Sequence, residues 1–99
     1  MNKQAYSDYV RCALRFYSRN LENPTFRCLA DEKNWNACET VLNKYFSKNK
    51  EVLISVYQAY DTIGDNVYES ANKYQIPQGN IWTMMKRLEE YVARERGLI

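Results

Sequence analysis

The stretch YQIPQGNIWTMMKRLEEYVARERG, residues 74–97, places Pro77 and Gly79 two positions apart, directly ahead of a long helical pattern. The whole chain of 99 residues has only three Gly and two Pro. Because both residue types interrupt helices, the pair predicts a sharp corner followed by a helix over about residues 79–96. Gly97 suits the left-handed position that ends a helix, and Leu98 is expected to fold back onto its last turn.

The same helical period runs through the rest of the chain. Apolar residues recur at intervals of three and four, which predicts amphipathic helices. The expected helices cover about residues 3–19, 31–46, 49–60, 65 or 66 to 74, and 79–96. The expected inner faces hold Tyr6, Tyr9, Val10, Ala13, Phe16, Tyr17, Trp35, Cys38, Val41, Leu42, Tyr45, Phe46, Val52, Leu53, Val56, Tyr57, Val67, Ala71, Tyr74, Ile81, Met84, Met85, Leu88, Tyr91 and Val92.

These helices predict an all-α fold, a five-helix single domain spanning residues 1–99 with a C-terminal helix-turn-helix. Residues 1–48 would supply the N-terminal helices and residues 49–99 the helix-turn-helix unit. Local signals refine the ends: Pro24 interrupts a connector, Asp31 is a candidate N-cap, and Asn66 with Glu69 resembles a capping box.

The composition argues against an enzyme. The chain has no His, and its three Cys residues (Cys12, Cys28 and Cys38) have the spacing of neither a zinc site nor a disulfide framework. We therefore expect free thiols in or near the core, no metal and no cofactor. No Gly-rich phosphate loop or nucleophile elbow is present. The chain also lacks an apolar run long enough for a membrane span and a secretory signal at its start, which predicts a cytoplasmic protein without membrane contact.

Charge gives only a weak indication of the partner. The formal net charge is +2, so a nucleic-acid interface must be argued from the pattern of residues. Arg11, Arg15 and Arg19 follow one another at intervals of four on the outer side of the first helix. They form either a solvated face, with Asp8 pairing Arg11 and Glu22 pairing Arg19, or a stripe that faces phosphate or a protein partner.

Residues 66–96 meet the requirements of a helix-turn-helix, two helices joined by a turn of about four residues. Ala71 is small where the helices would cross, and Gln75 occupies the turn position that is often a left-handed Gly. The apolar positions around the turn are filled by Tyr74, Ile76, Ile81, Met84 and Met85.

From KEVLISVYQAY (50–60) through ESANKYQIPQGNIWTMMKRLEEYVARERG (69–97), the sequence resembles region 4 of sigma-70-family factors. The matching positions are Glu51, Val52, Leu53, Ala71, Ile76, Gly79, Ile81 and Met85. The sequence departs from the family at Pro77 (commonly Ser), Trp82 (commonly basic) and Met84 (commonly Arg). With LRFYSR (14–19), NWNACE (34–39) and RERGLI (94–99), the whole chain also resembles small proteins of phages and conjugative elements of Gram-positive bacteria. These resemblances imply a regulatory role in a mobile element.

A helix-turn-helix would place its second helix in the major groove of duplex DNA. The residues expected to face DNA are Gln78, Asn80, Trp82, Thr83, Lys86 and Arg87. Asn80 could read adenine, Thr83 a thymine methyl group, and Lys86 or Arg87 guanine or phosphate. Gln78 and the first backbone N–H groups of the helix could hold a phosphate. Alternatively, Lys86 and Arg87 pair with Glu90 and Glu89 or stay solvated, and Trp82 is half-buried packing.

The leading hypothesis is a DNA-binding, transcription-type regulator of a phage or mobile element. RNA polymerase, another host protein or a second copy of the chain are the further partners that this hypothesis allows. The alternative is a non-enzymatic protein-interaction module, such as a phage-encoded binder or inhibitor of a host protein. It would use either the arginines of the first helix or an exposed Trp82. A small structural domain that dimerises is the third reading.

Overall fold

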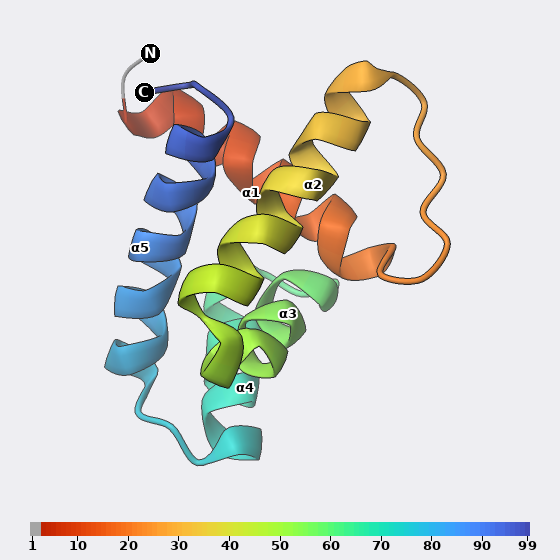
Figure 1. The fold of residues 1–99 in the computed structure, drawn as a ribbon. Coiled ribbons are helices and arrows are strands. Elements are labelled where there is room, and N and C mark those ends of the chain that lie inside the picture. The colour runs from red at the N-terminus through yellow and green to blue at the C-terminus, as the bar shows by residue number, and fades with distance from the viewer. Residues whose placement is uncertain (1–2) are drawn as a thin grey trace.

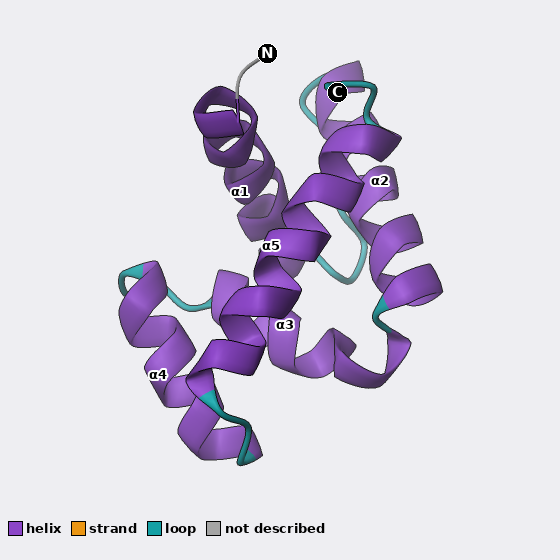
Figure 2. Ribbon diagram, turned by 90° about the vertical axis from the view of Figure 1, so that its left-hand side faces the viewer, coloured by secondary structure: helices purple, strands orange, loops and turns teal. Residues whose placement is uncertain are grey.

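The computed structural model describes residues 3–99, with side chains from Ala5 onward, and within this range it contains helices and no strand (Figures 1 and 2). The α-helices are α1 (Lys3–Arg19), α2 (Leu29–Tyr45), α3 (Lys50–Gln58), α4 (Ile63–Tyr74) and α5 (Gln78–Glu95), and a short 3-10 helix, η1 (Ser47–Asn49), precedes α3. The predicted all-α class with five α-helices is confirmed.

One hydrophobic core joins the five α-helices. Helix α1 packs against α2, α3 and α5, while α4 packs against α3 and α5. Helix α5 runs along one side of the molecule, away from the corner that joins it to α4 (Figure 1). The most buried side chains of the core are Val10, Leu14, Tyr17, Cys38, Val41, Leu42, Leu53, Val56, Tyr57, Val67, Ile81, Met85, Leu88, Val92 and Ala93. Helix α5 therefore has one buried face along most of its length.

Two tyrosines that were predicted to be buried lie at the rim of this core. Tyr45 is 55% exposed, with its ring 5.0 Å from that of Tyr91, and Tyr9 is 39% exposed. The side-chain amide of Asn34 donates to the hydroxyl of Tyr9 at 3.0 Å. Both tyrosines pack part of the ring and leave the rest in water, as amphipathic aromatic side chains commonly do. Periodicity alone did not separate rim from interior.

Helix α2 begins two residues earlier than predicted, and Asp31 is not its N-cap. Cys28 occupies that position without a capping side chain, and Leu29 is the first helical residue. Asp31 lies in the first turn, where its Oδ2 accepts from the backbone N–H and from Nε of Arg27 at 3.1 and 3.0 Å. A carboxylate there is favourable through the helix dipole as well as through this ion pair.

The predicted capping box of α4 is also wrong. The helix begins at Ile63, and the Oγ1 of Thr62 accepts from the backbone N–H of Asp65. Asn66 is buried, and its amide donates to main-chain carbonyls of the preceding segment, at 2.8 Å to Val56 and 3.2 Å to Ala59. Asn66 thus bonds carbonyls at the end of α3, whereas Thr62 is the N-cap of α4.

Both predicted left-handed helix ends are present. Gln75 has φ 57° and ψ 45°, and the next residue, Ile76, donates its N–H to the carbonyl of Ala71 at 3.1 Å. Gly97 has φ 74°, and the N–H of Leu98 reaches back to the carbonyl of Ala93 at 2.8 Å. This bonding pattern satisfies carbonyls that a helix end would otherwise leave without partners.

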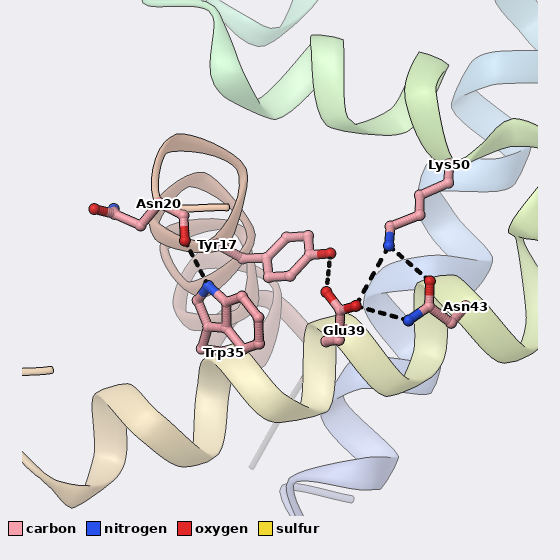
Figure 3. A network of polar contacts seen from close by, with 6 residues as sticks. All are labelled: Tyr17, Asn20, Trp35, Glu39, Asn43 and Lys50. Atoms are coloured by element: carbon pink, nitrogen blue, oxygen red, sulfur yellow. Dashed lines mark hydrogen bonds and ion pairs between the residues drawn. The ribbon is translucent and has the colours of Figure 1, made fainter. Parts of the chain in front are cut away.

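A polar cluster, drawn in Figure 3, ties α1, α2 and the start of α3 together. The Tyr17 hydroxyl donates to Oε2 of Glu39, and the Asn43 amide donates to Oε1 at 2.8 Å. Lys50 Nζ lies 3.5 Å from Oε1 of Glu39 and 2.6 Å from Oδ1 of Asn43. On the other side of Tyr17, the indole of Trp35 donates to the carbonyl of Asn20 at 2.9 Å.

Among residues 3–99, no helix combines the length and the apolar character that a bilayer crossing requires.

Candidate nucleic-acid interface

The six residues that were expected to face DNA are all exposed within residues 78–87 of α5, outside the buried stripe of Ile81, Met85 and Leu88. The six are Gln78, Asn80, Trp82, Thr83, Lys86 and Arg87, which we call the α5 flank. At a rise of about 1.5 Å per residue they extend over roughly 14 Å of helix. Trp82 is 40% exposed, so its ring is partly packed and partly open to solvent.

The corner between α4 and α5 sets the direction of the α5 flank. The left-handed backbone at Gln75 ends α4, and Pro77, with φ −57° and ψ 138°, is the N-cap of α5. The carbonyl of Pro77 accepts from the N–H of Asn80 at 3.0 Å, whereas no side chain caps the helix start. A helix start without a capping side chain retains backbone donors and a partial positive charge for an external anion.

Lys86 and Arg87 carry the positive charge of the α5 flank. Neither forms an ion pair with another side chain in the part of the chain that the structure describes. The carboxylates that could have neutralised them are engaged elsewhere: Glu89 bonds Arg11, and Glu90 lies 3.1 Å from Nη2 of Arg94. Both cations are exposed, so their charge is available to a partner.

The hydroxyl of Thr83 is used within its own helix. Its Oγ1 donates to the carbonyl of Gly79 at 2.9 Å, one turn earlier. This bond leaves the methyl group of Thr83 as the part of the side chain that remains for a base contact. The observation is compatible with the expected thymine contact, which is apolar.

The three arginines of α1 do not form one common surface. Arg19 is turned toward the end of α3, where Nε donates to the carbonyl of Gln58 at 3.1 Å and Nη2 to that of Ala59 at 3.0 Å. Its guanidinium also lies 3.9 Å from the ring centroid of Tyr60, so it does not pair with Glu22 as one reading had it. Arg15 is half-buried and has no ion pair among the described side chains.

Arg11 forms an ion pair with Glu89, a contact that the sequence did not predict. Its Nε lies 2.9 Å from Oε2 of Glu89, and Tyr57 donates its hydroxyl to the same oxygen at 2.7 Å. Glu89 is charged and yet only 4% exposed, next to the core residue Leu88. Burial disfavours the charge on Arg11, but the hydrogen bond and the charge of Glu89 outweigh burial and raise the pKa of Arg11. Burial, followed by the negative charge of Glu89, raises the pKa of Tyr57.

The cysteines are free thiols in two environments. Cys38 is in the core, where burial raises the pKa of its thiol to about 12, whereas Cys12 and Cys28 are exposed. The expectation of thiols in or near the core thus holds for Cys38, and the other two lie at the surface. Across the described residues, no group of three or more His, Cys, Asp and Glu side chains is arranged to hold a metal ion.

Comparison of the sequence with protein-family models and with curated proteins, and of the structure with solved structures, found no match.

Proposed function

We propose that the protein is a DNA-binding, transcription-type regulator of a phage or other mobile element, in which α4 and α5 act as a helix-turn-helix and α5 enters the major groove. The observation that carries this proposal is the α5 flank. It is an exposed helical surface with two cations that lack acidic partners, held out by a sharp corner.

The electrostatics of α5 support a phosphate-rich partner. Of the four acidic residues from Glu69 to Glu95, the two nearest the cations, Glu89 and Glu90, are neutralised by Arg11 and Arg94. Positive charge therefore lies a little over two turns along α5 from its uncapped start, and both features favour DNA phosphates. Amide and methyl groups at Asn80 and Thr83 add side chains that can contact base edges.

The chain is small, and a single half-site of this size binds DNA weakly. A second copy of the chain or RNA polymerase is the partner that would raise the affinity, as the resemblance to region 4 of sigma-70-family factors implies.

Fluorescence anisotropy of a labelled random-sequence duplex at two salt concentrations tests the proposal. The affinity should fall steeply with salt, because each phosphate that the protein neutralises contributes about −0.9 to the slope of log K against log salt. Absence of duplex binding at low salt would remove the proposal.

A protein-interaction module is the second candidate, and the exposure of Trp82 favours it. An aromatic side chain that is 40% exposed beside a hollow is a common anchor in protein interfaces. In that case the duplex would not bind, and a Trp82→Ala variant would lose a specific protein partner while keeping its fold.

A further inference from the structure

A hollow of about 260 Å³ lies between α1 and α5, next to the α5 flank. It is lined by Tyr6, Ser7, Arg11, Trp82, Met85, Lys86 and Glu89. Trp82 and Lys86 belong both to this hollow and to the α5 flank, so the two features are continuous. The hollow brings the first half of the chain into contact with the proposed interface.

Arg11 is held in place at one edge of this hollow. Its Nε is bound to Glu89, whereas its Nη1 and Nη2 form no hydrogen bond with the part of the chain whose side chains are described, from Ala5 onward, and its side chain is 35% exposed. Tyr57 fixes the carboxylate from the other side. A guanidinium that is already oriented loses little conformational freedom when it binds a ligand.

We propose that Arg11 contacts a backbone phosphate of the duplex, beside Lys86, and so extends the DNA interface from α5 onto α1. This inference rests on the proposed function. Two terminal N–H groups on a planar guanidinium match a phosphate in a bidentate way. Glu89 neutralises one of the two cations that line the hollow, so the lining retains a net positive charge.

Other charged groups near Arg11 do not cancel the net positive charge of the hollow. Asp8 lies one turn earlier on α1 and acts on Arg11 through its charge. It is exposed, so water and salt screen it. The charge of Glu89 is already engaged, because its Oε2 accepts from both Arg11 and Tyr57. An incoming phosphate therefore meets the free side of the guanidinium.

The test replaces Arg11 and Glu89 together, as Arg11→Met with Glu89→Gln. This pair of changes leaves the net charge unaltered and avoids a buried unpaired carboxylate, and the amide introduced at position 89 retains an oxygen that can accept from Tyr57. We expect the salt slope to decrease by about 0.9 and the affinity for a random-sequence duplex to fall about fivefold to tenfold.

The matched control is Arg27→Met with Asp31→Asn, which removes another Arg–carboxylate ion pair without a change in net charge. That pair lies at the start of α2, at the upper right of Figure 1, whereas the first half of α5, which carries most of the α5 flank, lies at the lower left. The duplex affinity and salt slope of this control variant should equal those of the unaltered protein. Equal binding by the Arg11/Glu89 variant and the unaltered protein would overturn the inference.

A second measurement uses the unaltered protein and so does not depend on the folding of a variant. Arginine side-chain NMR during titration with the same duplex should show shifts in the Nη signals of Arg11, and unchanged Arg11 signals at saturation would also overturn the inference. The two proposals fail separately. If the unaltered protein does not bind duplex, both fall. If it binds and the Arg11/Glu89 variant binds with the same affinity and salt slope, the Arg11 contact alone falls.

Discussion

Nε of Arg11 and Oε2 of Glu89 lie 2.9 Å apart although the two residues are 78 positions apart in the sequence. The pair links α1 to the half-buried side of α5, and Tyr57 of α3 completes it. Three helices therefore depend on one carboxylate, and that dependence can be measured.

Arg11→Ala should lower the free energy of unfolding by about 2 kcal/mol. The variant leaves the carboxylate of Glu89 buried without its cation, and the expected loss is below that of a fully buried pair because Arg11 is partly exposed. Urea unfolding at neutral pH measures the change. Arg15→Ala, on the same helix and without an ion pair to any described side chain, should change stability by less than about 0.5 kcal/mol. Equal effects of the two changes would show that the ion pair contributes nothing to stability.

Glu39 should make stability depend on pH in the acid range. Burial acts to raise the pKa of Glu39, but the hydrogen bonds from Tyr17 and Asn43 and the charge of Lys50 outweigh burial, so the pKa is lowered. A lowered pKa in the folded state contributes stability above the usual Glu value of about 4.3, and this contribution is lost as the pH falls through the folded pKa.

Glu39→Gln should therefore be less stable than the unaltered protein at pH 7, with a difference that narrows as the pH falls below about 4.3. Urea unfolding over a pH series gives this difference directly. Asn36→Ala, also on α2, changes no titratable group, so its difference from the unaltered protein should stay constant. A constant difference for Glu39→Gln as well would mean that the polar cluster does not favour the ionised carboxylate.

Gln75→Gly should raise the stability. Relief of the left-handed backbone at Gln75 gains about 1–2 kcal/mol, and the extra freedom of Gly in the unfolded chain costs about 0.5–1 kcal/mol, which leaves a net gain of about 0.5 kcal/mol. The exposed bond from the Gln75 amide to the carbonyl of Asn72 adds little. The melting temperature, followed by circular dichroism, should rise by about 2–4 °C.

The control for this change is Glu69→Gly, at an exposed position within α4. There the backbone is right-handed, and Gly should destabilise by about 1 kcal/mol. A loss of stability at both positions would mean that Gln75 is not strained.

Lys86→Ala with Arg87→Ala should weaken duplex binding without unfolding the protein. Both side chains are exposed and lack ion pairs among the described residues, so the fold does not depend on them. Loss of two phosphate contacts would reduce the salt slope by roughly 1.8. Anisotropy at several salt concentrations measures the slope, and circular dichroism checks the fold.

Lys33→Ala with Lys44→Ala removes the same amount of charge from exposed positions on α2. If this control weakens binding as much as the α5 variant does, net charge rather than the α5 flank determines binding.

Much of the fold could be predicted because its signals are local. Apolar stripes with a helical period gave the helices, and the special backbone at Gln75 and Gly97 followed from the corner and from a Gly near the chain end. The starts of α2 and α4 were misplaced because capping depends on competition among neighbouring side chains. Asp31 bonds to Arg27, and Thr62 rather than Asn66 caps α4.

The exposed residues of the candidate site could be predicted from the sequence, but the polar contacts behind them could not. The exposure of Lys86, Arg87 and the rest of the α5 flank follows from the stripe on its opposite face. The role of Glu89 does not, since its partners Arg11 and Tyr57 come from two other helices, and nothing within α5 distinguishes Glu89 from its neighbour Glu90. Long-range polar contacts of this kind become visible only when the helices are assembled.

The contact of Arg19 with the carbonyls of Gln58 and Ala59 means that the end of α3 is bonded in part by the last residue of α1. A fragment that starts at residue 49 would lack this terminator, along with the Arg11 ion pair and the surfaces of α1 and α2 on which α5 rests. The C-terminal half is therefore not an independently folding unit that could be transferred to another protein. Any binding surface on α5 requires the intact chain.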